Sequence, residues 1–136
     1  MGSRTTARGF NREGLVPARR TADVDYRLAR QRMIDGFEKG AIGRDLVCDA
    51  QPMLLRNAEH CSTPTSIDCP ICAENQVRHV TYVFGPRLPA HGRCISTPKE
   101  LKRLANRQGE FTAYLIEVCL GCRWNHMVRT STLGNY

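Results

Sequence analysis

Apolar side chains recur at spacings of three and four in two segments near the start of the chain, and this period predicts two helices. Between residues 21 and 39 the apolar stripe consists of Tyr26, Ala29, Met33 and Phe37. From about residue 50 to residue 59 the apolar positions are Met53, Leu54, Leu55 and Ala58, around a proline that a first helical turn tolerates. Gly40 and Gly43 lie between the two segments. We therefore expect a helical hairpin over residues 21–63.

Three later segments are rich in β-branched and aromatic residues, which favours strands. They span residues 77–84, 111–118 and 124–131. Between the first two, the run Thr97-Pro98-Lys99-Glu100 has the form of a capping box with proline at the first helical position. It predicts an inserted helix at about residues 97–108. The expected fold is thus α+β, with an N-terminal α-hairpin followed by a three-stranded antiparallel sheet.

The chain has two Cys-x-x-Cys pairs. Cys69 and Cys72 precede the first of these strand segments, and Cys119 and Cys122 follow the second. Such a pair places two thiolates on one tight turn, and two facing turns form the closed tetrahedral site of one structural zinc ion. Residues 64–136 are therefore interpreted as a zinc ribbon, and the inserted helix explains the wide separation of the pairs. Cys-Pro-x-Cys also occurs in thioredoxin-like oxidoreductases, but those require a strand before the motif and a helix after it. His126 is the alternative fourth ligand.

Three further cysteines, Cys48, Cys61 and Cys94, lie outside the pairs. In a reducing compartment paired cysteines indicate metal ligands rather than disulfides. We expect these three to be small buried side chains. The alternatives are extra metal ligands or the reactive thiol of a redox sensor.

The chain carries 20 Lys and Arg against 13 Asp and Glu, a net charge of +7, which favours a polyanionic partner such as nucleic acid. Residues 1–20 contain five arginines and one acid, and they are expected to form a disordered basic arm. The candidate contacts to nucleic acid or to a protein partner are Arg4, Arg8, Arg12, Arg19, Arg20, Lys99, Lys102, Arg103, Arg107 and Trp124. For the helical cations the alternative is ordinary solvation, and for Trp124 it is packing against the second cysteine turn.

No apolar run is long enough to span a membrane, and no signal-peptide segment is found, so we expect a cytoplasmic protein. Gly2 and Thr6 fit a myristoylation pattern, but no second membrane signal accompanies them. The sequence also lacks the motifs of hydrolases, metalloproteases and nucleotide-binding loops. The expectation is a monomeric, non-catalytic protein without a small-molecule substrate.

The segments DLVCDAQPMLLRNAEH, DCPICAE, HVTYVFG, HGRC and CLGCRWNHMVR resemble a family of small actinobacterial zinc-ribbon proteins of unknown function. The resemblance covers about residues 24–130 and implies a four-cysteine zinc site at Cys69, Cys72, Cys119 and Cys122. It implies no activity. Because zinc ribbons recur in transcription and translation machinery, we expect an accessory factor that docks on a nucleic-acid machine, with RNA polymerase favoured. A ribosome-associated factor that binds rRNA and a zinc-dependent thiol redox sensor are the alternatives.

Overall fold

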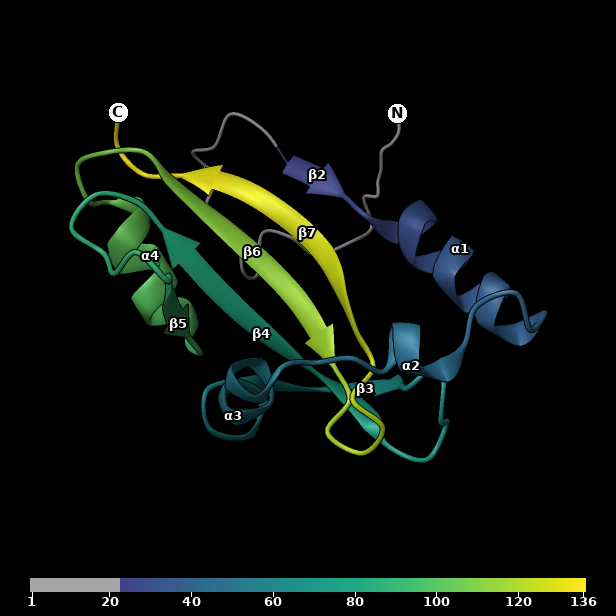
Figure 1. Cartoon of the computed structure of the whole chain (residues 1–136). Coiled ribbons are helices and arrows are strands. Elements are labelled where there is room, and N and C mark those ends of the chain that lie inside the picture. The colour runs from purple at the N-terminus through teal and green to yellow at the C-terminus, as the bar shows by residue number, and fades with distance from the viewer. Residues whose placement is uncertain (1–22) are drawn as a thin grey trace.

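A six-stranded antiparallel sheet organises residues 23–136, which are the residues that the computed structural model describes. The order across the sheet is β2 (Asp23–Asp25), β7 (Asn125–Leu133), β6 (Phe111–Val118), β4 (Gln76–Phe84) and β3 (Thr63–Asp68). The long, curved strands β4, β6 and β7 form its centre, and shorter strands lie at its edges (Figure 1). The outer edge of β4 also pairs with β5 (Arg93–Ile95), beyond the part that β3 occupies.

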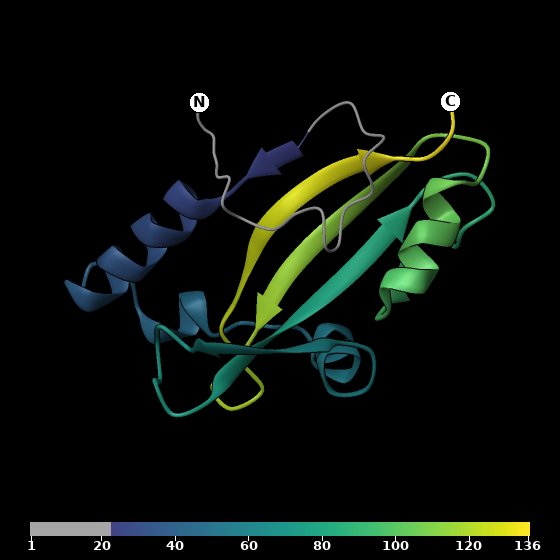
Figure 2. The same cartoon turned by 180° about the vertical axis from the view of Figure 1, so that it is seen from behind.

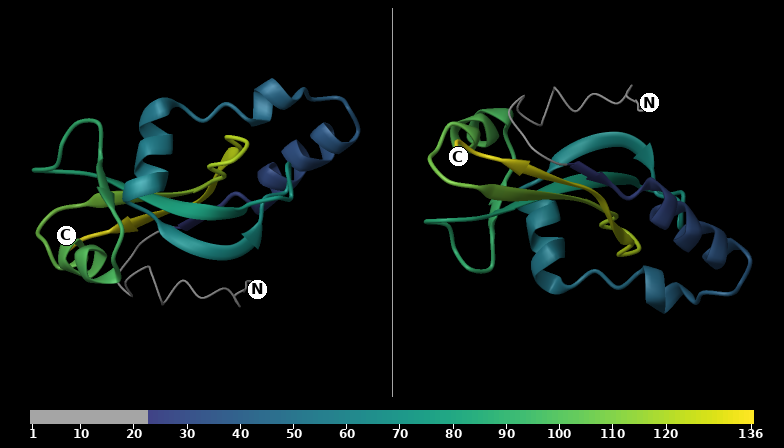
Figure 3. Two further views of the ribbon diagram at one scale, coloured as in Figure 1. Left: turned by 90° about the horizontal axis from the view of Figure 1, so that it is seen from below. Right: turned by 90° about the horizontal axis from the view of Figure 1, so that it is seen from above.

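Four helices pack on this sheet: α1 (Arg27–Glu38), α2 (Arg44–Val47), α3 (Pro52–His60) and α4 (Pro98–Ala105). Helices α3 and α4 cover opposite faces, as the views from below and above show (Figure 3). Successive side chains of a strand point to opposite faces, so β4 can serve both helices. Its Val80 packs under α3 and its Val83 packs under α4. Seen from behind, α1 lies at the far end of the sheet from α4 (Figure 2).

The core comprises three clusters of buried side chains. Under α4, Leu101 and Leu104 pack with Phe111 and Leu133 of the sheet. Under α3, Ala58 packs with strand residues of β4 and β6. The third cluster surrounds Trp124 at the other end of the sheet and includes Ile34, Val47, Val77 and two of the paired cysteines. The sheet therefore holds α3, α4 and the pair α1 and α2 over three different regions.

The α-hairpin expected at residues 21–63 is wrong. The two helices do not pack on each other: Ile34 of α1 belongs to the cluster around Trp124, whereas Ala58 of α3 belongs to the cluster on the other face. Each helix packs one apolar face on the sheet, because a helix can bury one stripe against any apolar surface that the fold offers. The predicted stripes are right only in part: Ala29 and Met53 are exposed, and Ile34, which the predicted stripe lacks, is the buried residue of α1.

The three-stranded ribbon is also wrong as a description of the whole sheet. Strands β4, β6 and β7 lie where the predicted strands do, but β2, β3 and β5 extend the sheet on both sides. Strands β2 and β5 have three residues each, too few to show a period. Strand β3 (TPTSID) is polar and largely exposed. Backbone pairing with a neighbour holds such edge strands, and this leaves no hydrophobic signal.

The inserted helix is confirmed as α4. Thr97 caps it, and its side chain accepts a hydrogen bond from the backbone N–H of Glu100 (3.2 Å). The basic arm proposed for residues 1–20 lies outside the described residues. Within the described residues, no helix is both long and apolar enough to cross a membrane.

Candidate metal centre

The four paired cysteines converge at one end of the sheet. Their Sγ atoms all lie within 4.8 Å of one another. The Sγ of Cys69 lies 3.6 Å from that of Cys122, and the Sγ of Cys72 lies 3.7 Å from that of Cys119. These separations are far longer than the S–S bond of a disulfide, about 2.05 Å. The arrangement is that of four separate sulfur ligands around one point.

In both cysteine turns the first cysteine accepts one backbone N–H at its sulfur and another at its carbonyl. In the first, the N–H of Ile71 donates to the Sγ of Cys69 (3.4 Å) and the N–H of Ala73 donates to the carbonyl of Cys69 (3.0 Å). In the second, the N–H of Cys122 donates to the Sγ of Cys119 (3.4 Å) and the N–H of Arg123 donates to the carbonyl of Cys119 (2.9 Å). Hydrogen bonds from N–H groups favour the thiolate form of sulfur.

The residue after each pair adopts a left-handed conformation: φ is 58° at Ala73 and 75° at Arg123. For residues other than glycine this conformation costs about 1–2 kcal/mol. The left-handed residue is retained because it directs the chain out of the cysteine turn toward the strand that follows. The N–H of Cys69 then bonds the carbonyl of Asn75, and the N–H of Cys119 bonds the carbonyl of Trp124, both at 2.8 Å. Each turn is thus closed by its own strand.

Burial and hydrogen bonding act on the thiols in opposite directions. The pKa of Cys72 is lowered to about 6, first by the backbone N–H of Glu74 and also by the side chain of Asn75. Burial raises the pKa values of Cys69 and Cys122 above the ordinary thiol range. Several buried thiolates in one place repel each other, and a bound cation is what would offset this cost. The site therefore favours a cationic occupant.

The second turn fits closely against the first. A Cβ atom on Gly121 would collide with the side-chain amide of Asn75. That amide donates to the Sγ of Cys72 (3.7 Å). A side chain at position 121 would displace this amide, so Gly121 preserves the hydrogen bond from Asn75 to Cys72.

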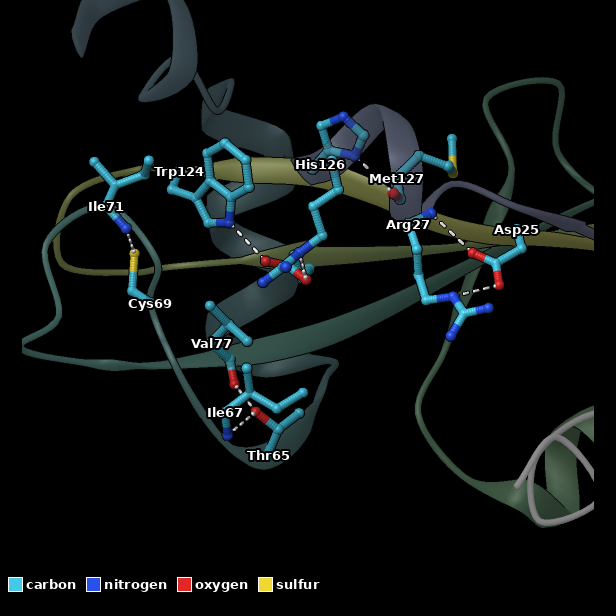
Figure 4. Close-up of polar contacts among 12 residues, drawn as sticks. Asp25, Arg27, Thr65, Ile67, Cys69, Ile71, Val77, Trp124, His126 and Met127 are labelled. Carbon is cyan, nitrogen blue, oxygen red and sulfur yellow. Dashed lines mark hydrogen bonds and ion pairs between the residues drawn. The ribbon is translucent and has the colours of Figure 1, made fainter. Parts of the chain in front are cut away.

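A buried carboxylate connects this centre to α1. Glu117 is 3% exposed, and it accepts hydrogen bonds from Nε of Arg30 (2.8 Å) and Nε1 of Trp124 (2.7 Å). Figure 4 shows the indole N–H of Trp124 directed at a carboxylate oxygen, with His126 beside it. The rings of Trp124 and His126 stack at a centroid distance of 5.8 Å. The second cysteine turn is therefore fastened to α1 through charge-assisted bonds.

The sequence did not indicate this network. Its one signal is that Glu117 occupies the inward register of β6, two positions after buried Leu115. A charged residue in that register needs a buried partner, because an unpaired buried charge is costly. The partner Arg30 lies 87 positions earlier in the chain, and no local pattern identifies it.

The other residues predicted to contact nucleic acid or a protein partner lie in different parts of the chain. Trp124 is fully buried, so it packs inside the fold and offers no surface for a base. Lys99, Lys102 and Arg103 are exposed on α4, and Arg107 follows the helix. Arg4, Arg8, Arg12, Arg19 and Arg20 lie outside the described residues. His126 is not among the converging ligands, and its Nδ1 lies 2.7 Å from the carbonyl of Met127.

The three remaining cysteines are half-buried. Cys48 packs against the cluster that contains the metal-site cysteines. Cys94 lies beside Cys61, and its Sγ donates to the carbonyl of Cys61 (3.1 Å). Burial raises the pKa of Cys94 above the ordinary thiol range. None of these three belongs to the group of converging ligands found among the described residues.

Residues 16–136 match a protein family described as a family of unknown function (DUF5318). Similar proteins include the uncharacterized protein Rv0049 of Mycobacterium tuberculosis and the uncharacterized protein Mb0050 of Mycobacterium bovis. Each is 40% identical over 111 residues, which are 82% of this chain and 81% of the relative. No solved structure matches the chain. The family match includes the whole described part and all four converging cysteines.

Proposed function

We propose that this chain, which belongs to the family of unknown function DUF5318, is a non-catalytic accessory protein whose four-cysteine site holds structural zinc. The membership confirms the resemblance expected from the sequence, and neither the family nor its mycobacterial relatives carry a described activity. The role is therefore argued from the chain's own surfaces. It docks on a nucleic-acid machine, with RNA polymerase favoured over the ribosome.

The observation that carries the zinc assignment is the donor set. Four thiolates and no open ligand position are typical of structural zinc. Zn–S bonds of about 2.3 Å in a tetrahedron place the sulfurs about 3.8 Å apart. Two sulfur pairs lie 3.6 and 3.7 Å apart and all four sulfurs lie within 4.8 Å of one another, so the cysteines are close to the spacing that the ion requires. A closed site of this kind stabilises the fold and supplies no substrate position.

An apolar hollow on the sheet supports docking on protein. It has a volume of about 300 Å³ and is lined by Tyr82, Phe84, Tyr114, Ile116 and Met127. Phe84 and Tyr114 pack edge to face, with ring centroids 5.4 Å apart. Helix α3 covers one end of this face and leaves the hollow open. Apolar aromatic hollows of this kind mark binding surfaces.

The chemistry of the hollow selects the kind of partner. None of its lining residues carries a charge, so it is unsuited to a phosphate backbone and suited to an apolar protein surface. The excess positive charge of the chain is located elsewhere, at residues 1–20 and around α4. Protein docking through the hollow, with cationic segments directed at nucleic acid, accounts for both features.

Metal content tests the zinc assignment. Cys119→Ser removes one of four ligands, so zinc per chain, measured by atomic emission after desalting, should fall well below one, and the melting temperature should fall with it. Cys61→Ser is the matched control, because Cys61 lies outside the converging group and should keep full zinc. Full zinc and unchanged melting in Cys119→Ser would exclude the assignment.

Affinity capture from a mycobacterial lysate tests the docking proposal. The tagged chain should enrich RNA polymerase subunits at moderate salt, and Met127→Glu should abolish this enrichment by placing a charge in the apolar hollow. Leu28→Glu is the control, because Leu28 is an exposed apolar residue on α1, outside the hollow. Enrichment of ribosomal proteins would favour the ribosomal alternative. Enrichment of neither machine would overturn the proposal.

The thiol redox sensor is less well supported. A reactive sensor thiol has a lowered pKa and an accessible sulfur. The pKa of Cys94 is instead raised by burial, which keeps its thiol protonated near neutral pH. Slow, uniform labelling of Cys48, Cys61 and Cys94 in the zinc-loaded protein is the expected result.

A further inference from the structure

Three arginines from two separate segments surround one pocket at the α4 end of the sheet. Arg93 comes from β5, Arg103 from α4 and Arg107 from the turn after it. The other lining residues are Ile95, Glu100 and Leu104, and the pocket volume is about 330 Å³. The elements that carry its lining residues, α4 and β5, lie far along the sheet from the second cysteine turn, which follows β6 (Figure 1). Its lining residues belong neither to the four-cysteine site nor to the apolar hollow.

The helical period explains why these side chains converge. Glu100, Arg103 and Leu104 are three and four positions apart on α4, so they lie on one face of the helix, and the turn after the helix brings Arg107 to the same pocket. Leu104 is buried by the sheet and forms the floor with buried Ile95. Lys99 and Lys102 do not line the pocket. The cations of this region are therefore of two kinds, those around the pocket and those on the open surface.

The charges at the pocket are not balanced within the protein. Arg93 has a partner, since its guanidinium lies 3.6 Å from the carboxylate of Glu100. In the described part of the chain, neither Arg103 nor Arg107 pairs with a carboxylate. A helix C-terminus favours nearby cations, and this could account for Arg103 and Arg107. It does not account for Arg93, which belongs to a different element and lines the same pocket.

We infer that this pocket binds a small phosphate monoester, with Arg93, Arg103 and Arg107 around the phosphate and the organic part against Ile95 and Leu104. The lining carries a net charge of two positive, which matches the charge of a phosphate monoester near neutral pH, about −1.5 to −2. A carboxylate or a phosphodiester has one negative charge and offers fewer terminal oxygens. Guanidinium groups bind such oxygens through paired, charge-assisted hydrogen bonds.

The pocket is larger than a bare inorganic anion. A water molecule takes about 30 Å³ of liquid volume, so 330 Å³ exceeds what inorganic phosphate fills. The volume is at the lower end of small-molecule pockets, about 300–1,000 Å³. A sugar phosphate or a nucleoside monophosphate has the right combination of charge and organic surface. We expect the ligand to be bound and not converted. Apart from Glu100, the described residues that line the pocket include no nucleophile or general base, and the carboxylate of Glu100 accepts hydrogen bonds from Ser96 and Thr97 at the helix cap.

Isothermal titration with adenosine monophosphate tests this inference, with inorganic phosphate and adenosine as partial ligands. We expect saturable one-to-one binding of the monophosphate, weaker competition by phosphate, and no binding of adenosine. Arg103→Gln and Arg107→Gln should each weaken binding about tenfold or more, because each removes a charge-assisted contact. The matched control is Lys102→Gln, the same charge change on the same helix outside the pocket, and it should change affinity less than about twofold.

Three outcomes would overturn the inference. One is the absence of saturable binding up to about 10 mM monophosphate. Another is an equal loss of affinity in Lys102→Gln and Arg103→Gln, which would indicate diffuse surface charge. The last is tighter binding, through Arg103 and Arg107, of an oligonucleotide that lacks a terminal phosphate. Zinc content and melting temperature of each variant verify folding, so failure here is distinguishable from failure of the zinc and docking proposals.

Discussion

Glu117 and half-buried His79 are neighbouring polar residues beside the candidate metal centre. Glu117 accepts hydrogen bonds from both Arg30 and Trp124. His79, its partner across the sheet on β4, is instead favoured in the neutral form. Burial lowers the pKa of His79, Glu117 opposes this, and Arg129 and Arg30 add to it. A neutral imidazole next to a satisfied carboxylate avoids a second buried charge.

His79 predicts a specific dependence of stability on pH. Because its pKa is lower in the folded protein than the ordinary value of about 6.5, the unfolded chain binds the proton more readily. The free energy of unfolding should therefore fall as pH decreases below about 6.5. Chemical denaturation between about pH 7.5 and 5.5 should show a smaller decrease in His79→Gln than in the wild type. His91→Gln, at an exposed position, should behave as the wild type. Equal slopes in all three proteins would contradict the prediction.

Among the elements, α4 depends most on local sequence. Thr97 accepts from the N–H of Glu100, and Glu100 accepts in return from the N–H of Ser96 (3.4 Å). The first bond satisfies a backbone donor that the helix start leaves free, and the second satisfies the N–H of the residue before the cap. The cap also sets where α4 begins, and so which residues face β5. The position of the arginine pocket therefore depends on it.

Removal of the cap should destabilise the protein moderately. Thr97→Ala should lower the free energy of unfolding by about 1 kcal/mol, measured by urea denaturation, because the N–H of Glu100 loses its acceptor. Thr97→Ser keeps a hydroxyl and should retain most of the stability. If serine and alanine cost the same amount, the contribution of Thr97 is packing and not capping.

The molecule as a whole is held at its two ends by different means. At one end the cysteine turns, α1 and Trp124 form a cluster that depends on the proposed zinc ion. At the other end α4 packs on Phe111 and Leu133 without any cysteine. The strands β4, β6 and β7 run between the two ends. Loss of metal should therefore act unequally along the sheet.

Chelation tests this asymmetry. Hydrogen exchange after treatment with a zinc chelator should increase most at the two cysteine turns and in α1, which Arg30 fastens to the second turn through Glu117. Amides of α4 and of the adjacent ends of β4 and β6 should keep more of their protection. Added zinc should restore the original pattern. A uniform increase over all strands would show that the sheet is one cooperative unit.

Local patterns were sufficient for the features that local chemistry governs. The two Cys-x-x-Cys turns, the capping box at Thr97 and the β-branched and aromatic runs of β4, β6 and β7 each depend on a few consecutive residues, and the structure confirms them. Local patterns could not predict four other features. These are the packing partners of α1 and α3, the polar edge strands, the pairing of Glu117 with Arg30 and the meeting of Arg93 with α4. Each joins residues far apart in the chain, and an apolar stripe or a lone charge specifies that a partner is needed without specifying which one. Only the folding of the chain around the sheet determines which residues become these partners.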